Sequence, residues 1–336
     1  MTAKMGSQTI VFPSKPTLTA YATVAGPKES QGPVGPYFDK VLPDISLNQK
    51  SFESAEQLMM STSIELALEK GSLARDMVDF FIAGDLLNQI ITSGFSALNL
   101  GAPFLGIYSA CSSFCEGLIL AGLLVDSGGA QNVVSATSSH NCTAERQYRY
   151  PTEYGAQLPP WAQHTVTGAA ATIVSARGSG PKLELATVGR VMDLGIKDPF
   201  NMGAAMAPAA ADTIFVHMQD TARKPSDYDL IVTGDLGKVG REILVELGQR
   251  QGYDLGSNYR DCGELIYSKE QTENSGASGC ACVALVTLGL LFSQNYQRIL
   301  VVATGALHSP TSYQQGANIP TIAHAVSIEF PNGGGN

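Results

Sequence analysis

VDFFIAGDL, residues 78–86, recurs further along the chain as YDLIVTGDL, residues 228–236. Each copy has an acidic residue, four mostly apolar residues and a closing Gly-Asp-Leu. This pattern is typical of a short buried strand that ends in a turn. Two copies of one strand and turn suggest that a larger unit of the chain is duplicated.

The similarity continues downstream of both copies. GIYSACSS (106–113) precedes the apolar stretch VVSAT (133–137) in the first copy, and NSGASGC (274–280) precedes LVVAT (300–304) in the second. In each copy a helix fits between the two strands, which indicates parallel or mixed sheets sandwiched by helices. A duplication of such units predicts two similar halves packed face to face, with a site where equivalent strand ends meet.

The repeat divides the chain into two expected halves, residues 1–180 and 181–336. Residues 1–50 are rich in Gly and Pro and are expected to form an irregular N-terminal arm with one opening strand at 9–12. The stretch 138–163 is polar and has little periodicity, so we expect a long loop that serves a ligand or a dimer surface.

Composition narrows the class of protein. The chain has 336 residues, of which 44% are hydrophobic and only 15% charged, which describes a compact globular protein. A net charge of −9 without a basic cluster argues against nucleic acid as a partner. The six cysteines lack paired zinc-site spacing, and no signal peptide is apparent, so we expect reduced thiols inside the cell. The longest apolar run, 280–292, is too short to cross a bilayer and predicts a buried helix.

Cys111 is the sharpest candidate for chemistry. It follows an apolar strand and begins a helix rich in Leu and Ala, so the helix dipole would stabilise its thiolate. The alternative is a buried cysteine that acts as a small apolar residue, the commoner state of free Cys. Ser109, Ser112 and Ser113 surround it with polar groups that a plain core would avoid, which favours a site.

Asp85 and Asp235 end equivalent strands, so the duplication should direct both towards one central cleft. They are candidates for oxygen ligands of a hard cation, or for acceptors that orient polar groups of a ligand. Capping of the following helices is an equally good explanation for either residue alone.

Arginines and histidines supply further candidates. Arg146 and Arg149 lie on the polar stretch among tyrosines, where guanidinium forks and aromatic rings suit an aromatic dicarboxylate. Their alternative is ion pairing with Glu145 or Glu153 within a loop. Five histidines remain: His140 and His308 follow the repeated strands and should approach the site from the side, His324 lies in a run near the last strand, and His164 and His217 are expected to be structural.

Several motifs resemble known families. SACSS (109–113), TVTGAAA (165–171) and NSGAS (274–278), together with the duplication, are similar to the thiolase and ketoacyl-synthase III superfamily. Longer motifs resemble the stage V sporulation protein AD family of endospore formers: AGPKE (25–29), AGDLLNQ (83–89), ATSSHNCTAER (136–146), YPTEYG (150–155), MAPAAADT (206–213), SGCAC (278–282) and IPTIAH (319–324). The resemblance implies a duplicated α/β sandwich of five layers, αβαβα, that forms a homodimer through strands of the first half.

The same resemblance speaks against catalysis. Condensing enzymes of the superfamily pair a nucleophilic Cys with two donor side chains, His and His or His and Asn. Cys111 matches the nucleophile and Asn274 the Asn, but Gly234 and Asp235 occupy the place of the His. A carboxylate accepts hydrogen bonds and cannot stabilise an oxyanion, so we expect a degenerate thiolase fold that is not an enzyme.

The family resemblance implies a ligand and a setting. The implied function is non-catalytic binding of dipicolinic acid (pyridine-2,6-dicarboxylate), free or as its calcium chelate, and participation in its uptake into the developing spore. The setting is sporulation and germination, with the protein peripheral at the spore inner membrane beside other proteins of its operon. The expected ligand-binding residues are Cys111, Asp85, Asn88, His140, Arg146, Asp235, Asn274 and Ser278.

No cofactor or metal of the protein's own is expected. Calcium enters only as an open alternative, carried with the ligand and met indirectly by Asp85 and Asp235. Two other functions remain open: a residual acyltransferase that uses Cys111, and a structural scaffold with a vestigial cleft.

Overall fold

Two sets of five strands form the framework of the computed structural model, which describes residues 3–149, 158–271 and 274–331. The first set, in spatial order, is β6 (Phe104–Gly106), β5 (Phe80–Gly84), β7 (Asn132–Ser139), β9 (Gly168–Ser175) and β3 (Thr17–Ala25). The second is β12 (Tyr259–Asp261), β11 (Leu230–Thr233), β14 (Arg298–Ala306), β15 (Thr321–Glu329) and β10 (Lys182–Thr187).

The two sets share one topology. In each set, the repeated Gly-Asp strand (β5 or β11) lies parallel to both of its neighbours. Further towards the centre every pairing is antiparallel: β7 with β9 and β9 with β3 in the first set, β14 with β15 and β15 with β10 in the second. A single residue pair, Thr17 with Lys182, joins β3 to β10, so the long strand order consists of two equivalent sheets that touch at one corner. The α/β architecture predicted from the repeat is confirmed.

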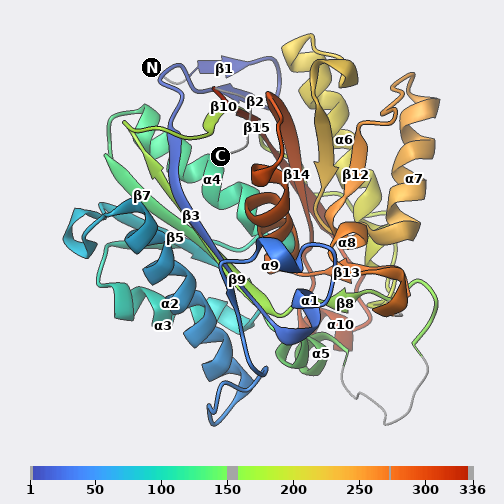
Figure 1. The fold of residues 1–336 in the computed structure, drawn as a ribbon. Helices are drawn as coiled ribbons and strands as arrows, with labels where there is room; N and C mark the ends of the chain where they lie inside the picture. The colour runs from blue at the N-terminus through green and yellow to red at the C-terminus, as the bar shows by residue number, and fades with distance from the viewer. Residues whose placement is uncertain (1–2, 150–157, 272–273, 332–336) are drawn as a thin grey trace.

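Helices cover both outer faces and fill the space between the sheets (Figure 1). α2 (Phe52–Gly71) and α3 (Ile91–Leu100) lie outside the first sheet, and α6 (Met202–Thr221) and α7 (Gly237–Arg250) outside the second. The middle layer holds α4 (Ser113–Asp126) and α9 (Cys280–Leu285), which continues as a π-helix (Val286–Leu290) and a 3-10 turn (Leu291–Ser293). The five layers are therefore αβαβα, and the run 280–292 is the buried helix that its apolar composition predicts.

Shorter elements connect these layers. The strands are β1 (Ala3–Met5), β2 (Thr9–Val11), β4 (Lys40–Val41), and the small parallel pair β8 (His164–Thr165) and β13 (Ala277–Ser278). The helices are α1 (Pro27–Ser30), α5 (Asn141–Tyr148), α8 (Cys262–Leu265) and α10 (Pro310–Gln314). Single 3-10 turns span Gly35–Tyr37, Arg75–Met77, Asn88–Ile90, Ala110–Ser112, Pro225–Asp227 and Lys269–Gln271.

Two expectations about irregular segments were wrong. The N-terminal arm contains β3, a nine-residue strand at the inner edge of the first sheet, because the run TLTAYATVA combines β-branched and aromatic residues that suit a pleated surface. The polar stretch 138–163 is not a continuous loop, since β7 runs through Ser139 and α5 follows at once. His140 explains that helix start, because its Nδ1 accepts the N–H of Cys142 as an N-cap.

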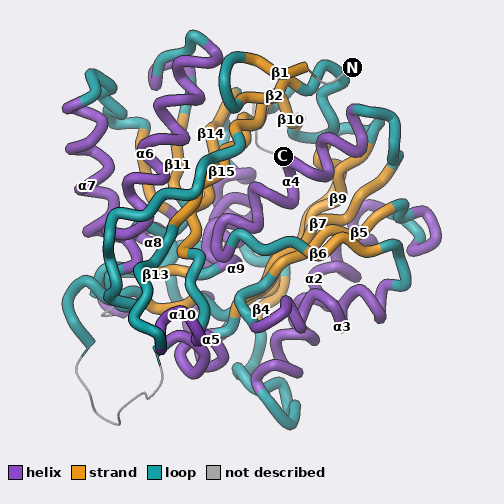
Figure 2. Tube along the Cα trace, turned by 180° about the vertical axis from the view of Figure 1, so that it is seen from behind, coloured by secondary structure: helices purple, strands orange, loops and turns teal. Residues whose placement is uncertain are grey.

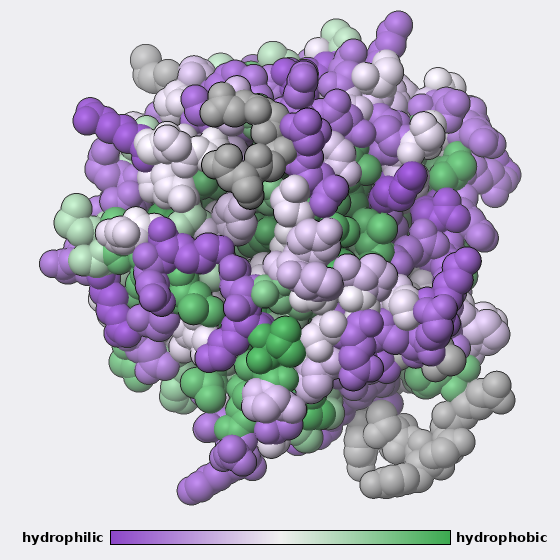
Figure 3. Space-filling view, in the orientation of Figure 1, coloured by the Kyte–Doolittle hydropathy of each residue, from purple (hydrophilic) through white to green (hydrophobic). Residues whose placement is uncertain are grey.

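The strand ends that matter for function lie together at one end of the molecule. α5, α10 and β13 lie near one another in the lower half of both views (Figure 1 and Figure 2), and β8 pairs with β13. Hydrophilic side chains predominate on the face shown in Figure 3, with smaller hydrophobic areas between them. Across the described residues, no helix combines the length and apolar content that crossing a bilayer requires.

A buried carboxylate ties this end to the first sheet. Glu56 on α2 is fully buried and accepts hydrogen bonds from Ser138 Oγ (2.8 Å) on β7 and Thr143 Oγ1 (3.1 Å) on α5. Burial, together with the negative charge of Asp85, raises the pKa of Glu56 to about 8. The native state therefore holds a proton on Glu56 at pH values where the unfolded chain has released it.

This proton predicts a pH-dependent stability. Because the pKa is raised on folding, the contribution is complete below the ordinary pKa of 4.5 and is lost as the pH rises through about 8. Glu56→Gln, which mimics the protonated acid, should reduce the fall in unfolding free energy between pH 6 and pH 8 by about 1–2 kcal/mol in chemical denaturation. Glu69→Gln, on the exposed C-terminal end of the same helix, is the control and should keep the wild-type profile; identical profiles for both variants would contradict this role of Glu56.

Candidate functional site

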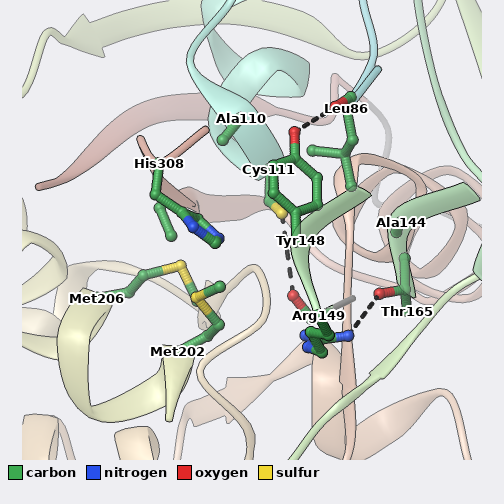
Figure 4. A pocket seen from close by; sticks show the side chains of 12 residues that line it. Leu86, Ala110, Cys111, Ala144, Tyr148, Arg149, Thr165, Met202, Met206 and His308 are labelled. Carbon is green, nitrogen blue, oxygen red and sulfur yellow. Dashed lines mark hydrogen bonds between the residues drawn. The ribbon is translucent and has the colours of Figure 1, made fainter. Parts of the chain in front are cut away.

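A small cavity opens where the first turn of α4 meets the ends of strands from both halves. Its volume is about 30 Å³, which is room for roughly two water molecules. Figure 4 shows its walls, which come from α5, α6, β8, β13 and the segments after β5 and β14. The lining residues are Leu86, Ala110, Cys111, Ala144, Tyr148, Arg149, Thr165, Met202, Met206, Ser278, Ala306 and His308.

Cys111 reaches this cavity from a tight turn. Ala110 adopts a left-handed conformation (φ 51°), which directs the next side chain away from the strand and towards the second half. Cys111 Sγ lies 3.9 Å from Ser278 Oγ, and the neighbouring Cys280 thiol donates to the carbonyl of Ala110 at 3.0 Å. The cavity thus brings together the starts of α4 and α9, the equivalent buried helices of the two halves.

The electrostatics around Cys111 oppose thiolate formation. A hydrogen bond with Cys280, burial and the nearby Asp235 carboxylate all raise the pKa of the Cys111 thiol well above its ordinary value. The expectation that the helix dipole would stabilise a thiolate is therefore wrong, because burial and a buried acid outweigh it. The residue carries a protonated thiol at neutral pH.

Asp235 lies behind the cavity wall and accepts hydrogen bonds from residues around it. Its carboxylate accepts hydrogen bonds from Thr304 Oγ1 (2.5 Å), Ser278 Oγ (2.8 Å) and the N–H of Gly279 (3.1 Å). Gly279 is the N-cap of α9, so Asp235 caps a helix distant in sequence. A different residue serves α7, the helix that follows Asp235 directly. The carboxylate of Asp261 accepts hydrogen bonds from the N–H groups of Leu236 and Gly237 at the start of α7.

Asp85 has a similar structural task in the first half. Its carboxylate accepts hydrogen bonds from the N–H of Leu87, the N–H of Ser93 and Ser93 Oγ. Asp85 thus binds an N–H in the first turn of α3, although Ile90, and not Asp85, is the N-cap residue of that helix. Burial raises the pKa values of Asp85 and Asp235 alike. Neither residue lines the cavity, and among the described residues no three His, Cys, Asp or Glu side chains converge as metal ligands.

The arginine at the cavity is Arg149. It is buried, donates from Nε to the carbonyl of Pro199 (3.3 Å), and forms an ion pair with Glu145 one turn earlier. Figure 4 shows it beside Thr165, with its guanidinium at the lower wall of the cavity. Arg146 projects from α5 to the exterior, pairs with Glu53 and lines a separate surface groove.

His308 is the histidine of the cavity. Its ring lies against Tyr148, with 4.8 Å between ring centroids, and burial, reinforced by the charge of Arg149, lowers its pKa to about 4. Its Nδ1 is buried and has no hydrogen-bond partner within the described part of the chain. A neutral imidazole with an unpaired nitrogen is therefore available to a ligand in the cavity.

The other expected ligand residues lie elsewhere. His140 accepts at Nδ1 as the N-cap of α5, and its Nε2 lies 2.9 Å from the carbonyl oxygen of Ile45. Asn88 is on the surface beside Gln147, and Asn274 is exposed, with its amide donating to the carbonyl of Pro159. His324 accepts the N–H of Gly189 and lies outside the cavity lining.

Two of the eight residues expected to bind ligand, Cys111 and Ser278, line the cavity. A third, Asp235, lies behind them and accepts a hydrogen bond from Ser278. Arg149 and His308 were considered from the sequence but were not chosen as ligand residues. Tyr148 is one of the rings that the sequence suggests for an aromatic dicarboxylate, and it lines the cavity, whereas Met202 and Met206 are not predicted there. The apolar spacing of Ala144 and Tyr148, four residues apart on one helical face, was the signal that would have pointed α5 inwards.

Comparison with solved structures places the fold. The synthase III for 3-oxoacyl-[acyl-carrier-protein] from Aquifex aeolicus VF5 superposes with a TM-score of 0.59 over 94% of this chain and all of its own, at 14% identity. A variant of OleA from Xanthomonas campestris gives a TM-score of 0.61 over 98% of this chain and all of its own, also at 14% identity. These proteins are enzymes, and at this identity they show a shared thiolase-like fold alone.

Comparison of sequences places the family. The family model described as "Stage V sporulation protein AD (SpoVAD)" matches residues 6–329. The stage V sporulation protein AD of Bacillus subtilis (strain 168) is 49% identical over 332 residues, which cover 98% of each chain. A match of this length and identity leaves no substantial part of either chain outside the relationship. The chain belongs to the stage V sporulation protein AD family.

Proposed function

We propose that this sporulation protein binds dipicolinic acid, free or as its calcium chelate, in the cavity beside Cys111, without transforming it. The proposal extends to participation in the uptake of the ligand into the developing spore. In that setting the protein acts inside the cell, peripheral to the spore inner membrane, with membrane proteins of the same operon as partners.

The observation that carries the binding proposal is Arg149. A buried guanidinium beside a small cavity is the group best suited to a planar carboxylate, because it offers two parallel donors. His308 adds an unpaired nitrogen, and its ring supplies an aromatic surface for a pyridine ring. In this proposal these groups take the ligand-binding role that was expected of Arg146, which lies outside the cavity.

Charge balance at the cavity favours the calcium chelate. Arg149 already forms an ion pair with Glu145, so the guanidinium offers less than one full charge to a ligand. Dipicolinate is a dianion at neutral pH, and the chain has a net charge of −9. A neutral chelate avoids this repulsion, whereas the free dianion must compete with Glu145 for the guanidinium.

Acyl transfer by Cys111 has weaker support. A nucleophilic thiol needs a base or a cation beside it, but the groups that surround Cys111 raise its pKa. Ser278 faces the thiol, and within the described residues no hydrogen bond joins Cys111 to a histidine.

Condensation or thiolysis of acetyl or malonyl thioesters is therefore expected to stay at the background rate. Turnover abolished by Cys111→Ala would favour the acyltransferase instead.

A homodimer through the first half is part of the proposal. β6 is the edge strand of the first sheet, and its outer side pairs with no described strand. Apolar side chains lie exposed on and around it: Ile91, Phe95, Leu98, Leu105 and Tyr108. Such a surface suits burial against a second copy.

Sedimentation at micromolar concentration should show a dimer that Leu98→Glu weakens, and a monomeric wild-type protein would contradict this part.

The role of Arg149 can be tested by substitution. Arg149→Ala should weaken dipicolinate binding by roughly 1.5–3 kcal/mol, the range for hydrogen bonds to charged groups, and Arg149→Lys should also lose affinity because an ammonium lacks the planar fork. Arg146→Ala, three residues earlier on α5, is the matched control and should bind like the wild type. Calorimetric titration measures all three, and thermal unfolding confirms that each variant is folded. Wild-type affinity in Arg149→Ala would refute this account of recognition.

A further inference from the structure

Two hollows of very different size lie on either side of one side chain. The inner one is the cavity of about 30 Å³ beside Cys111, and the outer one is a surface groove of about 280 Å³. The groove is lined by Leu87, Asn88, Gln89, Ile90, Gly106, Ile107, Tyr108, Tyr148 and Ser309. Among the described residues, Tyr148 is the one that lines both hollows.

The inner cavity is too small for an organic ligand in this conformation. Pockets that hold small organic molecules typically measure about 300–1,000 Å³, which the outer groove approaches and the inner cavity does not. A pyridine dicarboxylate therefore reaches Cys111 and Arg149 only if part of the wall moves. Tyr148 is the part whose movement joins the cavity to the groove.

The contacts of Tyr148 suit a movable wall. It is the last residue of α5, and its hydroxyl contacts the carbonyl of Leu86 and lies 3.3 Å from the hydroxyl of Tyr108. Its ring packs against His308 at a tilt of 40°. Figure 4 shows the ring crossing the cavity with its hydroxyl directed to Leu86. These contacts involve neutral groups, whereas Arg149 beside it is anchored by an ion pair.

We propose that the Tyr148 side chain is a door between the outer groove and the inner cavity. When it swings away from Leu86 and Tyr108, the two hollows form one site that reaches from the groove to Cys111, His308 and Arg149. The expected occupant is a planar aromatic dicarboxylate, which enters along the groove and takes the place of the tyrosine ring beside His308. This part of the inference rests on the proposed function, but the door itself does not.

Alkylation of Cys111 tests the door without dipicolinate. In this reaction the thiol loses its proton to the buffer, the sulfur displaces iodide from an iodoacetamide derivative, and a carbon–sulfur bond replaces the carbon–iodine bond. Peptide mass spectrometry of the full chain under native conditions gives the rate at Cys111. Cys142, which is half-buried outside the cavity, provides the reference rate in the same sample.

Two reagents of different size separate access from reactivity. Tyr148→Ala should accelerate labelling of Cys111 by iodoacetamide at least tenfold, and labelling by a bulky N-aryl iodoacetamide by a larger factor. A change in the thiol pKa alone would raise both rates by the same factor. Tyr148→Phe, which keeps the ring but loses the hydroxyl contacts, should give a smaller acceleration and provides a second variant if Tyr148→Ala is unstable.

Two control variants test whether reagents reach Cys111 from the groove beside Tyr148. Tyr313→Ala changes a ring in the neighbouring surface groove that also contains Arg146, and Met202→Ala changes the wall of the cavity contributed by α6. Tyr313→Ala should label Cys111 at the wild-type rate, and Met202→Ala, which enlarges the cavity without joining it to the groove, should accelerate labelling less than Tyr148→Ala. Unchanged labelling in both Tyr148 variants, equal factors for the two reagents, or equal acceleration by Met202→Ala would overturn the door. If labelling behaves as expected but dipicolinate neither binds nor protects Cys111, the door stands and the proposed ligand fails.

Discussion

The contact between the first turn of α4 and the strands of the second half determines the rest of this site. Ser112 Oγ donates to the carbonyl of Ala303 (2.8 Å) on β14 and accepts the N–H of His324 (3.1 Å) on β15. Gly305 on β14 allows this close approach, because a Cβ there would lie 2.1 Å from the carbonyl oxygen of Ser109. The two halves are thereby locked together at the turn that carries Cys111.

This junction explains why the cavity is both buried and shared. Cys111 comes from the first half, while Ser278, Asp235 and His308 come from the second. Asp235 occupies the region in which a catalytic donor was expected, but it is engaged as an acceptor for Ser278, Gly279 and Thr304. The polar groups around Cys111 stabilise the structure and leave a protonated thiol.

Long-range features of the fold could be predicted from the sequence because the duplication is visible in it. The equivalent strands β5 and β11, and the buried helices α4 and α9, follow directly from the repeated Gly-Asp-Leu and Cys segments. β3 was not predicted, because the Gly and Pro residues around it are typical of an irregular arm, although its own nine residues suit a strand.

Side-chain direction within the site could not be read in the same way. Arg146 and Arg149 are three residues apart, but α5 ends at Tyr148, and Arg149 follows as its C-cap residue in a non-helical conformation (φ −126°, ψ 20°), which the sequence does not reveal. Asn274 precedes β13 and contacts Pro159, whereas Ser278 lies in β13 and donates to Asp235, and the pairing of β13 with β8 that separates them is long-range. The residues that face a ligand were therefore set by packing between the halves, which one sequence does not display.

The most direct test of the account is whether a ligand occupies the cavity beside Cys111. Calorimetric titration of the purified protein with dipicolinate, with and without calcium, should give one binding site per chain. Cys111→Trp, whose side chain adds more volume than the cavity of about 30 Å³ offers, should abolish that binding, with thermal unfolding used to check that the variant is folded. Absence of binding to the wild type under both conditions, or wild-type affinity in a folded Cys111→Trp variant, would contradict the account.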